Sequence, residues 1–407
     1  MKKIIWIINE YAGSPFHGAG TRHYYLGRIL TRKGIKVRII SSSYSHLFLN
    51  RPRIKGVFTD EIIEGVDYTW VKVPFYKHSQ SVMRVFKSFA FSSRLLGLPR
   101  VKAENPDVIV VSSPELLPTL PGYILAKRLR AKFLLEIRDI WPLCLVEEEG
   151  FSKYHPIVIF LQLIENFAYR KADAVISLLP DAFAHIKEHG GSEDKTYYIP
   201  NGILLEEVEK LEPLSEEIRG MIPKGKFVVG YTGTIGFANA VEYLIQAAKL
   251  LRGEKDILFL VVGQGKEKTK LMAMCHKWRL ENVIFLDPIP KRQVQSLLRE
   301  FVDACYMGIR YSPINRFGIS SNKLFDYFYS GKPIIYAVNS SNKPVDEAGA
   351  GISVPAGNPE AIAEAILKLK AMSPEEREEM GRRGREYVIA NHNWEILAEK
   401  FIEAITF

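Results

Sequence analysis

The sequence predicts an α/β protein built from two doubly wound parallel-sheet domains in tandem. Short apolar runs alternate with helix-length amphipathic segments through residues 1–204. A stretch rich in charge and proline follows at 206–224, and the same alternation then starts again. We therefore expect a Rossmann-like domain at 1–204, a second one at 205–387 with a cleft between the two, and a C-terminal helix at about 388–407 that packs back on the first domain.

Composition narrows the class of protein. The 407 residues are 47% hydrophobic and 25% charged, as in ordinary globular proteins. The net charge of +9 favours anionic partners, but it is spread along the chain. Without zinc-finger spacing or an RNA-binding aromatic pattern, we expect no nucleic-acid partner. Three widely spaced cysteines fit a reducing cytosol, and no apolar run is long enough to cross a membrane.

The first domain begins with a strand, a loop that ends in His17-Gly18-Ala19-Gly20, and a helix. This glycine spacing is not the Gly-x-Gly-x-x-Gly fingerprint, so a dinucleotide cofactor is weakly supported. Further strands end in polar segments that face a ligand crevice in sheets of this type. The expected strands are 3–8, 37–40, 68–73, 107–111, 133–137, 174–178 and 196–199, and the expected helices are 21–33, 122–130, 156–170 and 181–189.

The segment 79–100 has a different composition. Apolar residues alternate with Arg84, Lys87, Arg94 and Arg100, and the segment contains no acidic residue. This pattern predicts a basic amphipathic helix that lies on an anionic membrane surface. A core-packing helix with a solvated basic face is the alternative.

The second domain repeats the scheme after the expected linker at 206–224. The expected strands are 227–231, 257–262, 283–286, 304–309, 334–336 and 352–354. Helices are expected from 241, from just after Gly265 to about 278, and at 294–301, 323–330, 359–371, 374–387 and 394–405. Polar turns follow several of the strands, as in the first domain.

The stretch 310–336 is the strongest candidate site. Ser320, Ser321 and Asn322 favour a helix N-cap, and Gly331 suits the end of that helix. Free N–H groups together with Lys323 suit a phosphate, and the carboxylate of Asp326 suits sugar hydroxyls. The alternative is a well-capped amphipathic helix without a ligand.

The order of motifs resembles the GT-B glycosyltransferases, and within them the retaining family 4 enzymes of bacterial surface polysaccharides that are related to fucosaminyltransferases. The resemblance covers nearly the whole chain. Six fragments carry it in register: Gly18-x-Gly20-x-Arg22-His23, Arg138-Asp139-x-Trp141-Pro142, Pro200-Asn201-Gly202, Gly233-Thr234-x-Gly236, Gly263-x-Gly265, and Ser321-Asn322-Lys323 followed by Asp326 and Gly331-Lys332-Pro333.

The resemblance implies transfer of a sugar, an N-acetylated hexosamine or deoxyhexosamine, from a UDP-sugar to a polyprenyl-diphosphate-linked saccharide. The enzyme would work in the cytoplasm, peripherally at the inner face of the cell membrane, and would need no cofactor. No Asp-x-Asp pair stands at a strand end, so we also expect no metal. The expected donor-binding residues are Gly18, Gly20, Gly233, Thr234, Gly263, Gly265, Pro288, Ile289, Ser320, Ser321, Asn322 and Asp326.

The remaining roles are assigned with alternatives. Lys323 would neutralise the leaving phosphate, and Asp139 with Arg138 would orient or deprotonate the acceptor, unless the two form a structural salt bridge. His17, Arg22, His23 and Trp141 would lie on the acceptor side, and a packing or surface role for the first three is equally compatible with the sequence. Asp326 could instead complement the helix dipole, and the turns at 263–265 and 288–290 could be ordinary loops.

Two departures from the family pattern make Lys323 the leading candidate for neutralising the phosphate charge. The family has two acids separated by seven residues, and Gly318 stands at the position of the first. The family also has two bases at the start of the second domain, where 232–240 has none. In addition, Leu143 and Cys144 replace the usual Glu-Ser after Trp-Pro, which bears on the acceptor. A UDP-N-acetylhexosamine 2-epimerase and a non-catalytic nucleotide-sugar sensor are the alternatives in function.

Overall fold

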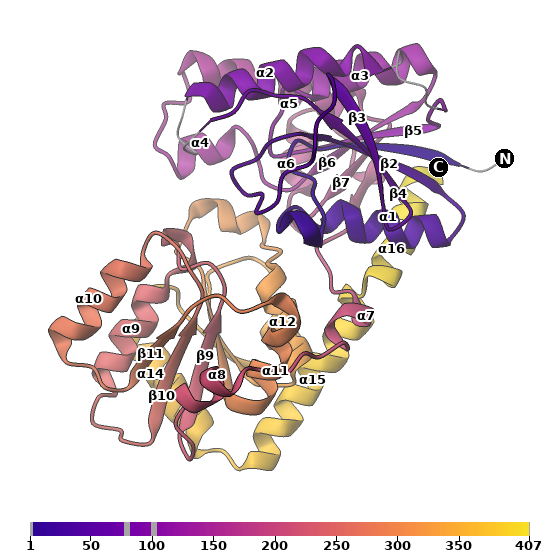
Figure 1. The fold of residues 1–407 in the computed structure, drawn as a ribbon. Coiled ribbons are helices and arrows are strands. Elements are labelled where there is room, and N and C mark those ends of the chain that lie inside the picture. The colour runs from indigo at the N-terminus through magenta and orange to yellow at the C-terminus, as the bar shows by residue number, and fades with distance from the viewer. Residues whose placement is uncertain (1–2, 77–81, 99–103, 407) are drawn as a thin grey trace. The chain divides into compact units, whose positions relative to one another are not determined.

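The protein divides into two compact units (Figure 1), which the computed structural model describes over residues 3–76, 82–98 and 104–406. Unit 1 consists of Met1–Asn201 together with Trp394–Phe407, and unit 2 consists of Gly202–Asn393. Each unit is a parallel-sheet α/β domain of the Rossmann-like type, which confirms the predicted fold class.

The sheet of unit 1 has the strand order β3-β4-β2-β1-β5-β6-β7-β8. The central strands β1 and β5 are almost wholly apolar and buried, as expected where helices cover both faces. The order reverses between β1 and β5, so their carboxyl ends flank the switch point at which open sheets bind ligands. The strands are β1 (Ile4–Ile8), β2 (Lys36–Ser42), β3 (Phe58–Ile63), β4 (Val66–Val71), β5 (Val108–Ser112), β6 (Lys132–Ile137), β7 (Ala174–Ser177) and β8 (Thr196–Tyr198).

Helices cover both faces of this sheet (Figure 1). Helix α1 contacts β2, β4 and α16, whereas α3 contacts β5, β6, α2 and α5, so the two groups lie on opposite faces. The helices are α1 (Arg22–Arg32), α2 (Val82–Leu95), α3 (Thr119–Leu129), α4 (Leu143–Glu147), α5 (Pro156–Lys171), α6 (Phe183–Glu188) and α16 (Trp394–Thr406). No helix among the described residues is both long and apolar enough to cross a membrane.

Unit 2 has the order β11-β10-β9-β12-β13-β14, with a switch point between β9 and β12. One apolar cluster lies on each face of this sheet. The strands are β9 (Phe227–Thr232), β10 (Ile257–Val262), β11 (Val283–Leu286), β12 (Ala304–Gly308), β13 (Ile334–Ala337) and β14 (Gly351–Val354). The helices are α7 (Leu205–Val208), α8 (Glu216–Met221), α9 (Val241–Leu250), α10 (Lys268–Trp278), α11 (Lys291–Phe301), α12 (Asn322–Ser330), α13 (Pro344–Glu347), α14 (Pro359–Ala371) and α15 (Pro374–His392).

Two expectations about the fold are wrong. The expected linker 206–224 contains α8 and most of α7, and its apolar residues Val208, Leu214 and Ile222 are buried in the core of unit 2. The charged residues and prolines of this segment therefore lie on the outer side of a segment that packs on unit 2, and the segment is not a linker. Strand β3, which pairs antiparallel with β4 at the edge of the first sheet, was not predicted. Its residues Thr59 to Ile63 are largely exposed, so they lack the buried apolar pattern of the other strands.

The C-terminal segment belongs to both units. Helix α15 ends at His392, and α16 begins at Trp394. Residues up to Asn393 pack in unit 2, whereas α16 contacts α1 and β7 of unit 1. The side chains of Trp394, Leu397 and Phe401 on α16 are fully buried there.

Candidate functional site

Three glycines of unit 2 allow two neighbouring loops to pack backbone against backbone. Gly233 follows β9, and Gly263 and Gly265 follow β10. A Cβ on Gly263 would lie 1.9 Å from the Gly233 carbonyl oxygen, and one on Gly265 would lie 2.2 Å from the Ile235 oxygen. These glycines are thus required by loop packing. Gly233 and Thr234 remain exposed at the carboxyl end of β9, where a ligand can reach their backbone.

Lys323 lies against this glycine loop. Its Cε is 3.5 Å from the Cβ position of Gly233, so the missing side chain leaves room for the lysine. The Nζ donates to the Tyr231 hydroxyl at 3.0 Å and to Asn239 Oδ1 at 2.5 Å. Burial lowers the pKa of Lys323 to about 7. The structure therefore brings together Lys323 and the Gly233-Thr234 turn, two parts of the predicted donor site.

The N-terminus of α12 begins one residue earlier than predicted, with Ser321 as its N-cap. The Ser321 side chain makes no capping hydrogen bond, so it does not block the first-turn amides. Ser320 and Ser321 are half-buried, and Asn322 is exposed. Gly318, which stands where the family has its first acid, has a φ of 93°. Acidic residues rarely adopt this backbone conformation, so the backbone here suits glycine.

Asp326 makes an ion pair with Lys291, which the sequence analysis missed. The Asp326 side chain is nearly buried, whereas Lys291 is largely exposed. Lys291 begins α11 directly after the Pro288-Ile289-Pro290 turn, whose Pro288 and Ile289 were expected to bind the donor. The sequence feature that could have indicated Lys291 is its position at the start of a helix, next to a candidate donor-binding loop. The pair holds the Asp326 carboxylate in place, on the same helix as Lys323.

A basic residue, Arg310, packs over the turn at 237–239. The two basic residues of the family pattern are missing from this region. The Arg310 guanidinium stacks over the Phe237 ring at 3.8 Å and pairs with Glu242 at 2.5 Å. Arg310 comes from the segment after β12, so no local motif at 232–240 could have indicated it. Glu242 already neutralises its charge, as Asp326 does for Lys291, so Lys323 is the leading candidate phosphate ligand beside this glycine loop.

In unit 1, the first glycine loop closes on itself. The Gly13 amide donates to the Gly20 carbonyl at 3.1 Å, and a Cβ on Gly20 would lie 1.8 Å from the Tyr11 oxygen. His17 was expected on the acceptor side, but its side chain is buried against Phe48 and Trp70, and its Nδ1 lies 2.9 Å from the Ser14 hydroxyl. Burial lowers the pKa of His17, so its imidazole is neutral at pH 7. Gly18 is exposed at the tip of this loop.

Arg22 and His23 bind a buried carboxylate that was not predicted. Glu136, on β6, accepts from Arg22 Nε at 3.0 Å and lies 2.7 Å from His23 Nε2. Burial would raise the pKa of Glu136, but the two basic side chains and the Ser112 hydroxyl outweigh it and hold the pKa well below its usual range. Arg22 also donates to the Pro200 carbonyl at 2.6 Å. The motif residues thus tie the start of α1 to the ends of β6 and β8.

Arg138 and Asp139 follow β6, as predicted. The Arg138 amide donates to the Ser113 hydroxyl at 2.8 Å, which joins the ends of β5 and β6. Asp139 is exposed, and Arg138 and Trp141 are half-buried. The surrounding protein raises the pKa of Asp139, and Arg138 opposes the shift.

The predicted basic face of the segment 79–100 is wrong for the residues that the structure describes. The Lys87 side chain is fully buried and pairs with Glu10 at 2.9 Å, and Arg84 pairs with Glu115 at 3.0 Å. The face exposed to solvent is apolar, and includes Phe86 and Phe89 at 59% and 53% exposure. Residues 79–81 and 99–100, with Arg100, lie outside the described residues.

Comparisons with known proteins agree with this architecture. Residues 17–202 match the family described as glycosyl transferase 4-like domain, and 216–387 match glycosyl transferases group 1. A probable glycosyltransferase of Pseudomonas aeruginosa, WbjE, is 23% identical over 98% of this chain and 97% of its own. A putative colanic acid biosynthesis glycosyl transferase of Escherichia coli K12, WcaI, is 26% identical over 54% of this chain and 56% of its own.

A solved structure shows the same fold. HepE of Anabaena, in complex with UDP and glucose, superposes with a TM-score of 0.69 at 14% identity, over 99% of each chain. The two matched domains together span nearly all of the sequence, in the order and with the sheets of a GT-B protein. The chain therefore belongs to the GT-B glycosyltransferases that combine a glycosyl transferase 4-like domain with a group 1 domain.

Proposed function

We propose that the protein transfers an N-acetylated hexosamine or deoxyhexosamine from a UDP-sugar to a polyprenyl-diphosphate-linked saccharide during synthesis of a bacterial surface polysaccharide. The observation that carries the donor assignment is the contact of Lys323 with the Gly233 loop at the N-terminus of α12. UDP and glucose in the solved HepE complex support a UDP-sugar. The name of WcaI supports a polysaccharide product.

The donor site would act on the departing diphosphate. Breaking the anomeric C–O bond leaves negative charge on that group, which fixed donors must stabilise. Lys323, the first amides of α12 and the Gly233-Thr234 backbone would supply them, with Lys291 as an outer cation. Asp326 would bind the ribose hydroxyls while Lys291 holds its carboxylate. We propose retention of configuration and no metal, since these donors supply the charge that a metal would otherwise provide.

The acceptor would be engaged by unit 1. Asp139 is exposed at the carboxyl end of β6 and is free to orient an acceptor hydroxyl or take its proton. Arg138 and Trp141 beside it would contact the acceptor's diphosphate and sugar. The Glu136 network does not touch the acceptor in this scheme, and it fixes the loops from which Asp139 and Trp141 project.

We further propose that unit 1 contacts an anionic membrane through the exposed apolar face of α2, which consists of Met83, Val85, Phe86 and Phe89. Aromatic and aliphatic side chains on one helix face insert at a lipid interface, and the net charge of +9 favours anionic lipid. The double variant Phe86→Asp/Phe89→Asp should lose binding to phosphatidylglycerol vesicles. Met272→Asp, at an exposed position on α10 of unit 2, is the control. Unchanged vesicle binding of the double variant would reject this surface.

The activity is tested in two steps. A thermal-shift screen with UDP-, GDP- and dTDP-sugars identifies the nucleotide, and labelled donor is then incubated with a lipid-linked saccharide. Transfer of label to lipid supports the proposal. Interconversion of free UDP-N-acetylhexosamines would indicate an epimerase. Micromolar binding without turnover across the donor panel would indicate a sensor.

A further inference from the structure

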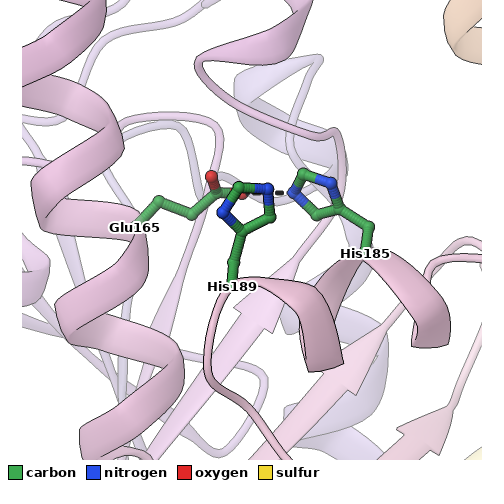
Figure 2. A group of neighbouring side chains, drawn as sticks. All are labelled: Glu165, His185 and His189. Carbon is green, nitrogen blue, oxygen red and sulfur yellow. Dashed lines mark hydrogen bonds and ion pairs between the residues drawn. The ribbon is translucent and has the colours of Figure 1, made fainter.

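Two helices of unit 1 bring three potential metal ligands together away from the strand ends of the candidate site. Glu165 lies on α5, His185 lies on α6, and His189 directly follows α6 (Figure 2). One ligand atom from each residue lies within 4.8 Å of the other two. His185 Nε2 is 3.0 Å from Glu165 Oε1, and the two imidazole centroids are 4.2 Å apart. The histidines are four residues apart, so both project from the same side of α6.

A second layer of side chains fixes the carboxylate. The Tyr169 hydroxyl donates to Glu165 Oε1 at 2.9 Å, and Gln162 Nε2 donates to Glu165 Oε2 at 2.6 Å. Both partners lie on α5, within one helical turn of Glu165. Hydrogen bonds of this kind orient metal-ligating carboxylates in proteins. The Glu165 side chain is almost fully buried, so its orientation is set by these contacts.

Gln162 and Asn166 connect the third ligand to the carboxylate. Gln162 Nε2 lies 2.6 Å from Glu165 Oε2, 2.8 Å from Asn166 Oδ1 and 3.1 Å from His189 Nδ1. His189 Nδ1 also lies 3.0 Å from Asn166 Oδ1, and when this nitrogen carries the hydrogen the other ring nitrogen keeps a lone pair. These contacts orient His189 beside the carboxylate, as outer partners orient metal-ligating histidines.

We propose that Glu165, His185 and His189 bind one Zn²⁺ ion that joins α5 to α6. Two imidazoles and one carboxylate are a known ligand set for Zn²⁺, whereas Mg²⁺ and Ca²⁺ prefer oxygen ligands throughout. A water molecule or Asn166 Oδ1 would supply the fourth ligand. Because α6 runs antiparallel to β7 and β8, its last turn lies toward their amino ends. The ion would thus stabilise unit 1 without entering the reaction, and the proposal does not depend on the transferase activity.

The test uses the full-length chain. The protein is stripped with a chelator, desalted, incubated with Zn²⁺ or with Mg²⁺, and desalted again. Bound metal is counted by plasma mass spectrometry, and the melting temperature is measured for each form. We expect about one Zn²⁺ per chain after desalting. In a parallel sample that is not desalted and holds free Zn²⁺ at a hundredfold excess over its dissociation constant, we expect a rise in melting temperature of about 5 °C. Mg²⁺ should give neither effect.

Variants assign the ion to the cluster. His185→Asn and His189→Asn should each lose the zinc, whereas His276→Asn, at an exposed position on α10, should keep it. Glu165→Gln removes the charge but keeps the shape, and far-UV circular dichroism checks its fold. Binding of less than about 0.1 Zn²⁺ per wild-type chain, or no shift of its melting temperature, would overturn the proposal without any variant. Zinc retained in both histidine variants would overturn it too.

Discussion

Replacing Lys323 by alanine tests both the donor site and its electrostatics. The lysine is held against the Gly233 loop by hydrogen bonds to Tyr231 and Asn239, and burial lowers its pKa to about 7. In the free enzyme about half of the molecules therefore carry the ammonium at pH 7, and about a tenth do at pH 8. A diphosphate bound next to Nζ would favour the charged form, so donor binding should take up a proton.

The size of the effect follows from these fractions. When only the protonated form binds, the apparent dissociation constant rises by the inverse of its population. The dissociation constant of a UDP-sugar should therefore increase about fivefold from pH 7 to pH 8 and approach tenfold per unit above that. Proton uptake should be about 0.5 at pH 7 and about 0.9 at pH 8. The direction is set by the lowered pKa, because raising the pH removes the charge that the phosphate needs.

Calorimetric titration of UDP-N-acetylglucosamine and UDP-glucose in buffers of different ionisation enthalpy measures this uptake. Lys323→Ala should abolish the proton uptake, weaken binding by about 10- to 100-fold through loss of a charged hydrogen bond, and cut turnover by at least about 100-fold. Lys277→Ala, at an exposed position on α10, is the matched control. A Lys323→Ala enzyme with wild-type affinity and the same pH profile would refute the assigned role.

Three further predictions concern the scaffold and are read from melting temperature and chemical unfolding. Glu136→Gln should destabilise the protein by about 3–5 kcal/mol, because it leaves a buried guanidinium without its counter-charge, and a loss below about 1 kcal/mol would contradict that. Gly263→Ala should cost at least about 2 kcal/mol, since its Cβ would lie 1.9 Å from the Gly233 oxygen at a φ of 151°, whereas Gly253→Ala, in open space, should be nearly neutral. Lys87→Met should cost about 3–5 kcal/mol, and adding Glu10→Gln should recover part of that loss; additive effects would argue against a coupled pair.

The elements predicted from the sequence are those whose pattern follows from burial. Continuous apolar strands such as β1 and β10, and the helix start at Ser321, are local consequences of residue type, so the fold class was predicted correctly. The exposed edge strand β3 and the packed segment 206–224 were mispredicted, because charge and proline there describe the surface of a packed element. Local composition does not distinguish such an element from a linker.

The candidate site shows a similar limit. Lys323 and Gly233 are 90 residues apart, yet both were selected because each has a local signature at a strand end or helix start. Lys291, the partner of Asp326, was not predicted, because nothing in the sequence near Lys291 indicates a carboxylate 35 residues further on. Likewise, Lys87 was assigned to a solvated face. Its partner Glu10 is 77 residues away, and such a pair produces no periodic pattern in the sequence.

The division of the chain between its units constrains how the protein is synthesised. Strands β1 to β8 emerge from the ribosome long before α16, yet α16 supplies the buried Leu397, Phe401 and Ile405, and its Trp394 stacks against the Arg22 guanidinium at 5.3 Å. Unit 1 therefore cannot complete its core until residues 394–406 have been translated, and unit 2, whose residues are contiguous, has all of its own sequence first. During synthesis, the N-terminal unit therefore has an uncovered apolar face until α16 has been translated.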